Sequence, residues 1–168
     1  KYFIFIITTC IPFGFCSANN SIDSTEIAAT IYKEYANKDE RKSSLRAIKS
    51  KIEASRSNDL EFVFYYHSAR YNYLIGKTEK VLQFSDSALN TSINKVFYKA
   101  KTYNLMGAAY SVNAQYEKAI KYMVQAMKIY DTHKDLYNSA IIKNNISNIF
   151  ISIRDYQSAY EYAFSAYN

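Results

Sequence analysis

The side chains that could perform catalysis or bind a metal are few, and they are far apart in this sequence. Neither His67 nor His133 has a carboxylate or a second histidine at the spacing of metal ligands or of an acid–base pair. The acidic residues Glu117, Asp155 and Glu161 fall where helix caps and solvated helix faces are expected. The two glycines after residue 18 are isolated, so they form no phosphate-binding loop. We expect no enzyme activity, no metal site and no cofactor.

Both cysteines, Cys10 and Cys16, lie in an opening segment that differs from the rest of the chain. Residues 1–18, KYFIFIITTCIPFGFCSA, begin with a lysine, continue with an apolar run and end with serine and alanine, which is the layout of a signal peptide. A transmembrane anchor is the alternative, but the segment is short of the roughly 20 apolar residues that cross a bilayer. Lipid attachment at Cys16 is disfavoured by the bulky Phe15 before it. We expect cleavage after Ala18 and export.

The remaining chain, residues 19–168, contains no cysteine, which excludes a thiolate nucleophile and a disulfide framework there. The net charge of the whole chain is +6, and the basic residues are spread along it. Nucleic-acid readers gather lysine and arginine on one face around a recognisable motif, and none is visible. We therefore expect no nucleic-acid partner for this region.

The elements that must position any functional side chain are helices. No proline follows residue 18, whereas a β-rich fold of this length needs frequent turn residues. Asp23 with Glu26, and Asn58 with Glu61, have the spacing of helix N-terminal caps. Apolar residues at helical period predict an all-α domain of four antiparallel hairpins, at about 24–56, 60–90, 94–131 and 135–167. The fourth hairpin stops inside its second helix, so we expect further chain beyond it.

The last two hairpins are copies of each other at a constant offset along the chain. This offset aligns Ala119 with Ala159, Tyr116 with Tyr156 and Gly107 with Ser147. A slightly shorter offset relates the second hairpin to the third and aligns Ala69 with Gly107, Val81 with Ala119 and Ala88 with Ala126. The hairpins are therefore repeats.

The third hairpin resembles the tetratricopeptide repeat family, whose pattern is an aromatic residue, then leucine and glycine, a tyrosine, and later alanine and an aromatic residue. The matching residues here are Tyr103, Met106, Gly107, Tyr110, Ala119, Met123 and Ala126, with Asp131 where the family has proline. The spacing between these hairpins exceeds the repeat length of about 34 residues that is usual in the family. The resemblance implies an α-solenoid that winds as a right-handed superhelix.

The small residues in this pattern are expected at close helix crossings. Gly107 and Ala119 would lie where the two helices of one hairpin cross, because a small side chain lets the helix axes approach. Ala126 would do the same toward the next hairpin.

In this family the first helices of the hairpins line a concave groove that receives a peptide. The resemblance implies that the groove residues are Tyr66, Arg70, Tyr73, Lys101, Asn104, Ser111, Asn144, Asn145 and Asn148. The asparagines could pair with a ligand backbone whatever its sequence, and Arg70 and Lys101 could hold an acidic group. The alternative is that these asparagines have no binding role, because the chain is rich in asparagine throughout. The lysine and asparagine clamp that the family uses for a terminal carboxylate is not reproduced.

The resemblance implies a non-catalytic scaffold for a protein or peptide ligand in the periplasm or envelope of a bacterium. Exported arrays of this kind often form the N-terminal sensing part of a signalling or transcriptional regulator, which would contact the membrane only through the signal segment or a downstream region. The alternative is an assembly module that forms homo-oligomers through its open C-terminal hairpin.

Overall fold

The computed structural model describes residues 22–34, 37–91 and 95–167, so the expected signal peptide, residues 1–18, lies outside the described residues. The described residues form eight helices and no strand, which confirms the all-α class. The helices are α1 (Ser24–Tyr32), α2 (Lys38–Ser55), α3 (Asn58–Leu74), α4 (Thr78–Asn90), α5 (Val96–Val112), α6 (Tyr116–Thr132), α7 (Leu136–Ser152) and α8 (Tyr156–Tyr167). Each of the four ranges expected from the sequence contains two of these helices. In the first range, however, α1 packs more on α3 than on α2.

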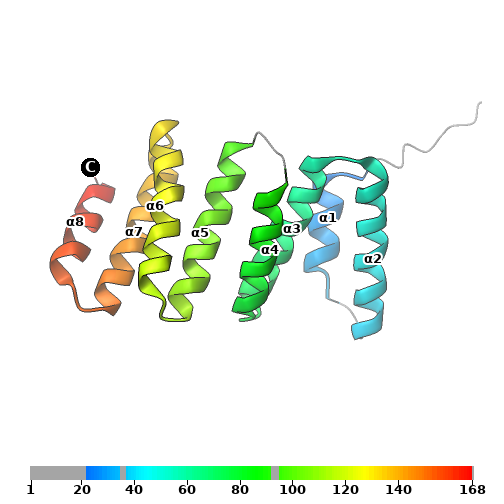
Figure 1. Cartoon of the computed structure of the whole chain (residues 1–168), viewed down its shortest axis with the longest axis horizontal. Coiled ribbons are helices and arrows are strands. Elements are labelled where there is room, and N and C mark those ends of the chain that lie inside the picture. The colour runs from blue at the N-terminus through cyan, green and yellow to red at the C-terminus, as the bar shows by residue number, and fades with distance from the viewer. Residues whose placement is uncertain (1–21, 35–36, 92–94, 168) are drawn as a thin grey trace, which may run out of the picture.

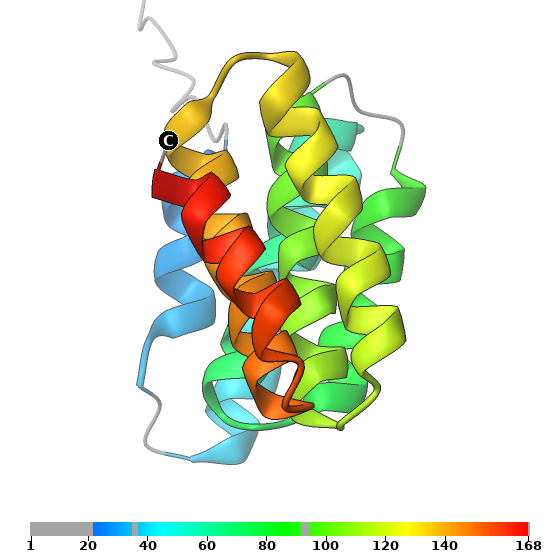
Figure 2. The ribbon, with the colours of Figure 1, turned by 90° about the vertical axis from the view of Figure 1, so that its left-hand side faces the viewer.

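The helices are stacked in one row along the long axis of the molecule, with α1 between α2 and α3, and successive helices run in opposite directions (Figure 1). Seen from the α8 end, the second helices α4 and α6 lie on one side of the row (Figure 2). Each helix from α3 to α8 packs mainly on its neighbours in the chain, and the most extensive contacts lie within the pairs α3 and α4, α5 and α6, and α7 and α8. The first helices α3 and α5 also touch each other. One side of the row is thereby formed by first helices of successive pairs.

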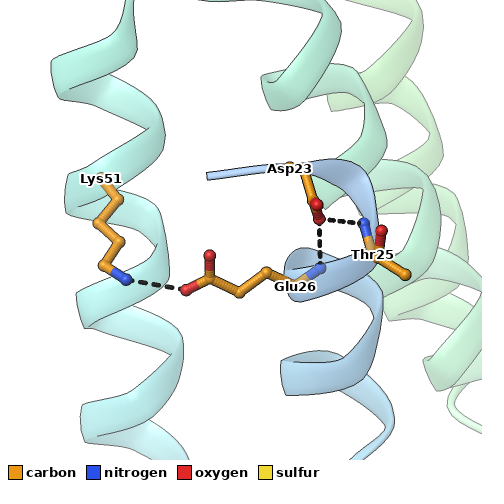
Figure 3. A network of polar contacts seen from close by, with 4 residues as sticks. All are labelled: Asp23, Thr25, Glu26 and Lys51. Atoms are coloured by element: carbon orange, nitrogen blue, oxygen red, sulfur yellow. Dashed lines mark hydrogen bonds and ion pairs between the residues drawn. The ribbon is translucent and has the colours of Figure 1, made fainter. Parts of the chain in front are cut away.

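The start of α1 is fixed by the cap expected from the sequence. The Asp23 carboxylate accepts hydrogen bonds from the backbone N–H groups of Thr25 and Glu26, both at 2.8 Å (Figure 3). The Glu26 side chain does not reach back to the cap; its Oε1 lies 2.8 Å from Nζ of Lys51 and so joins α1 to α2. The acidic group on the first turn therefore ties two helices together.

The expected cap of α3 was wrong by one residue. Ser57, not Asn58, occupies the N-cap, and its hydroxyl accepts from the N–H of Leu60 at 3.3 Å. Serine and asparagine both cap helices well, so residue type alone does not decide between two adjacent candidates. The extended backbone at Ser57 decides it.

The expected role of the small residues is confirmed. Gly107, Ala119 and Ala126 are all buried. A Cβ atom at Gly107 would lie 2.6 Å from Cγ of Met123 and 3.0 Å from the carbonyl oxygen of Ala119. No room therefore exists for a side chain where α5 crosses α6. Ala126 belongs to a core cluster with Ile142 and Ile146 of α7, as expected for a contact with the next pair.

Candidate binding groove

A cleft of about 570 Å³ lies along the first helices α3, α5 and α7. Eight of the nine residues expected to line a groove do line it: Tyr66, Arg70 and Tyr73 from α3, Lys101, Asn104 and Ser111 from α5, and Asn145 and Asn148 from α7. We call this cleft the groove. Its floor also includes Met123 and Tyr130 from α6. The fold therefore brings together side chains from three helices that are separated in the chain.

Asn144 is the expected residue that the groove does not include, and its side chain is exposed elsewhere. Asn144 occupies the same repeat position as Tyr66 and Asn104, which both line the groove. Those two residues each face a following first helix; Asn104, for example, accepts a hydrogen bond from Asn145 Nδ2 at 3.2 Å. No first helix follows α7 within the described residues, so nothing there closes the groove over Asn144.

The end of the groove between α3 and α5 is cationic. Arg70 and Lys101 are exposed there, and no carboxylate occurs among the described residues that line the groove. Lys101 Nζ lies 5.5 Å from the centre of the Tyr98 ring, which gives it a favourable cation–π contact. The same two cations also act on the neighbouring His67. Burial lowers the pKa of its imidazole, and the positive charges of Arg70 and Lys101 lower that pKa further. An anionic group is the ligand part that this end favours.

An apolar strip continues the groove away from the cations. Leu105, Ala108 and Val112 of α5 and Ile141 of α7 line it, with Val112 64% and Ile141 38% exposed. The groove residues predicted from the sequence did not include these four, because an apolar residue in a helix is normally assigned to the core. The repeat alignment contained the signal, since Ala108 is the equivalent of Arg70 in the next hairpin, and Ile141 is the equivalent of Lys101.

Polar side chains that can read a backbone lie along α7. The Asn148 side chain is exposed in the groove and forms no hydrogen bond within the described residues. Asn138 and Ser152 line the same wall, one toward each end of the helix. Because an amide both donates and accepts, such a row can satisfy the N–H and C=O groups of an extended peptide.

No family model, curated protein or solved structure matches this chain. Within residues 22–167, apart from the short undescribed gaps, no group of three or more His, Cys, Asp or Glu side chains could hold a metal ion. In the same described part, none of the helices combines the length and apolar character that crossing a membrane requires.

Proposed function

We propose that this chain is a peptide-binding scaffold of the tetratricopeptide repeat type, with helix hairpins stacked into a right-handed superhelix. The observation that carries the proposal is the groove, to which three repeats contribute at corresponding positions. Core packing alone does not require Arg70, Lys101 and several amide side chains to line one cleft. A ligand that runs along the cleft accounts for them.

The chemistry of the lining narrows the ligand class. The cationic end selects an aspartate or glutamate side chain, because charge-assisted hydrogen bonds from arginine and lysine to carboxylate are strong. The strip formed by Leu105, Val112 and Ile141 selects an apolar side chain further along the same ligand. The proposed ligand is an extended acidic segment that contains an apolar anchor.

A fluorescently labelled library of short peptides tests this proposal. One pool carries aspartate or glutamate near leucine, isoleucine or phenylalanine, and the matched pool carries lysine or arginine at the same acidic positions. Fluorescence anisotropy should detect binding of the acidic pool only. The double substitution Arg70→Ala/Lys101→Ala should weaken that binding by about tenfold, the size expected when hydrogen bonds to a charged group are lost.

The matched control is Lys121→Ala/Lys128→Ala, which removes two exposed cations of α6 that do not line the groove. This variant has the same net charge as the groove variant, so its affinity should stay close to that of the unmodified chain. Equal losses in the two variants would mean that net charge, not the groove, attracts the peptides. Equal binding of the two pools would contradict the proposal.

The signal-peptide layout of residues 1–18 supports a location in the bacterial periplasm or envelope, where the scaffold would form the N-terminal sensing part of a signalling or transcriptional regulator. Expression in a bacterium and mass spectrometry of the periplasmic fraction test the export step. The expected N-terminal residue is Asn19. A protein that keeps residues 1–18 in the cytoplasm would contradict export.

A further inference from the structure

A second cleft, of about 550 Å³, lies between α2, α3 and the start of α4. Leu45 of α2, Asn72 of α3 and Phe84 of α4 line it, and we call it the α2–α4 cleft. It shares no lining residue with the groove, and the spacing of its α3 residues places them on the opposite face of that helix. Here α2 makes few contacts with α3, whereas α4 and α6 pack extensively on the first helices that follow them. The volume is within the range of small-molecule sites.

The third and fourth hairpins each stack an aromatic residue of the first helix on one of the second helix. In the third hairpin the ring of Tyr122 stacks with that of Tyr110 at a centroid distance of 5.4 Å, and also with that of Tyr103 at 6.2 Å. In the fourth hairpin Phe150 and Tyr162 occupy the positions of Tyr110 and Tyr122. Their rings stack at 5.5 Å. In both hairpins a stacked ring pair therefore joins the two helices.

The second hairpin lacks one ring of this pair. Phe84 corresponds to Tyr122, and its ring stacks with that of Tyr65 at a centroid distance of 6.5 Å. The position of Tyr110 is occupied by Asn72, which has no ring. Both Asn72 and Phe84 line the α2–α4 cleft. The cleft therefore includes the space that a tyrosine ring fills in the next hairpin.

Two buried polar side chains line the same cleft. Ser68 is 7% exposed and Asn72 is 8% exposed. Asn72 Nδ2 donates a hydrogen bond to the carbonyl oxygen of Ser68 at 2.7 Å. Within the described residues, the Ser68 hydroxyl and the Asn72 Oδ1 atom have no hydrogen-bond partner. Because buried polar groups are normally hydrogen-bonded, these two atoms indicate a polar group on a ligand.

The charge of the cleft is positive. Among its described lining residues Asp39 is the only acidic one, and five are basic: Lys38, Arg41 and Lys42 from α2, and Lys77 and Lys80 at the start of α4. The four lysines form no ion pair within the described residues. Lys118, the equivalent of Lys80 in the third hairpin, lies with Nζ 5.4 Å from the centre of the Tyr110 ring. A ring that takes the equivalent place in the cleft should therefore lie beside Lys80, which favours an anionic substituent on that ring.

We propose that the α2–α4 cleft binds a small aromatic carboxylate of one or two rings. The ring takes the place that Tyr110 occupies in the third hairpin and stacks on Phe84. The lysines of the cleft hold the carboxylate. The Ser68 hydroxyl can donate to the ligand, and Asn72 Oδ1 can accept from a hydroxyl or N–H group on its ring. The site is separate from the groove, so this proposal does not depend on the peptide ligand.

Isothermal titration calorimetry of the full chain with indole-3-acetate tests the proposal, because this probe combines a ring, an N–H group and a carboxylate. One equivalent should bind. Tryptamine, which carries an ammonium group on the same ring, should bind at least tenfold more weakly. Octanoate, a carboxylate without a ring, should bind about fivefold more weakly, because the stacking contact is lost. No binding of indole-3-acetate, or an equal affinity for either of the other two probes, overturns the proposal.

The variant Lys77→Glu/Lys80→Glu reverses two exposed charges of the cleft. It should weaken indole-3-acetate binding at least tenfold and strengthen tryptamine binding, a gain that misfolding does not produce. The matched control, Lys121→Glu/Lys128→Glu, has the same net charge, and both of its affinities should stay close to those of the unmodified chain. Equal effects in the two variants would mean that net charge attracts the probe, which overturns the proposal.

Two further comparisons separate this site from the groove. The groove variant Arg70→Ala/Lys101→Ala should keep its affinity for indole-3-acetate, and a loss there would place the probe in the groove and overturn the α2–α4 site. In the peptide assay, Lys77→Glu/Lys80→Glu should behave like its charge-matched control. The two proposals can therefore fail separately.

The variant Asn72→Tyr tests whether the cleft is the space of a missing ring. The new tyrosine should stack on Phe84 as Tyr110 stacks on Tyr122, so the melting temperature should rise and indole-3-acetate binding should be lost. Circular dichroism confirms that the variant is helical. A folded variant with unchanged affinity for indole-3-acetate overturns the proposal, and if the variant does not fold, the charge-reversal result decides.

Discussion

At the scale of single residues, two different pairs of side chains allow paired helices to pack closely where they cross. In the α5 and α6 pair, Gly107 leaves room for Met123, whose Cγ would lie 2.6 Å from an added Cβ. In the α7 and α8 pair the corresponding residue is Ser147, whose Oγ donates to the carbonyl oxygen of Ala159 at 2.8 Å. The serine fits because the residue of α8 that corresponds to Met123 in the repeat alignment is the smaller Ala163. Glycine with methionine and serine with alanine are therefore two matched pairs.

The first prediction exchanges one pair for the other. Gly107→Ser should lower the free energy of unfolding by about 1 to 3 kcal/mol, because its Cβ overlaps Met123. Met123→Ala alone should cost about 2 to 5 kcal/mol, because Met123 is buried. The double variant should cost less than the sum of the two, by about 0.5 to 3 kcal/mol of coupling. Urea unfolding followed by circular dichroism gives all three values.

The control for this cycle is Met127→Ala. Met127 lies on the same helix and packs on the same core cluster, but it is not among the close neighbours of Gly107. Its cost should add to that of Gly107→Ser within about 0.5 kcal/mol. Coupling of similar size in both cycles would mean that α6 shifts as a whole, which would refute the specific contact with Met123.

At the scale of elements, each first helix from α3 onward ends in the same turn. The N–H two residues past the helix cap donates to the carbonyl five residues earlier, at 2.9 Å in each case: Lys77 to Asn72, Gln115 to Tyr110 and Asp155 to Phe150. The residue before each donor has a positive φ: 71° at Gly76, 55° at Ala114 and 63° at Arg154. This is the Schellman motif, in which glycine is favoured because it has no Cβ. Only one of the three turns uses glycine.

The second prediction follows from that difference. Ala114→Gly should raise the free energy of unfolding by about 0.5 to 1 kcal/mol, because the left-handed conformation costs alanine more than it costs glycine. The reverse change, Gly76→Ala, should lower it by a similar amount. No atom lies within 4 Å of an added Cβ at Gly76, so that loss would be purely conformational. Thermal unfolding of both variants measures the effect, and shifts of the same sign would disprove the explanation.

These turns also explain why the sequence predicted the helices well. The helical period continues without proline up to each turn, and Gly76, the segment 113–115 and the pair at 154–155 interrupt it at repeat spacing. The cap of α3 was missed because Ser57 and Asn58 have similar capping ability, and only the backbone conformation separates them.

Most of the polar lining of the groove was predictable, although Asn138 and Ser152 were missed and Asn144 was wrongly included, whereas the apolar lining was not predictable. Arg70, Lys101 and Asn145 stand out against a helical stripe, so their side can be assigned from a repeat pattern. Leu105 and Ile141 cannot be assigned in this way, because a first helix is apolar toward both the core and the groove, and a hydrophobic stripe does not show which apolar side is solvated. The structure decides it: Leu105 packs on the cluster of Ala69, Val81 and Ala109, whereas Ile141 is 38% exposed.

At the scale of the whole molecule, the core of the described residues is divided along the row. One large cluster joins α1, α2 and α3 and includes Ile27, Ile52 and Val63. The other joins α5, α6 and α7 and includes Tyr130 and Ile146. They share no residue, and two small clusters between them link α3, α4 and α5. In such a row, stability is close to a sum of terms from neighbouring elements.

The third prediction is that damage to one cluster stays local. Ile146 is fully buried, so Ile146→Ala should cost about 2 to 5 kcal/mol. Amide hydrogen exchange should accelerate in α5, α6, α7 and α8 and remain unchanged in α1 and α2. Ile52→Ala, in the other large cluster, should accelerate exchange in α1, α2 and α3 and leave exchange in α7 and α8 unchanged. Uniform acceleration along the chain in either variant would show a single cooperative unit and contradict the division.

The groove crosses this division, which connects stability to binding. Arg70 lies on α3, in the N-terminal part, and Lys101 lies on α5, in the C-terminal part. A carboxylate held by both side chains would strengthen the link between the two parts, since a ligand stabilises every element it contacts. In the Ile146→Ala variant, an acidic peptide from the binding pool should therefore slow exchange in both α3 and α5. Protection confined to one of these helices would place the ligand elsewhere than across the cationic end.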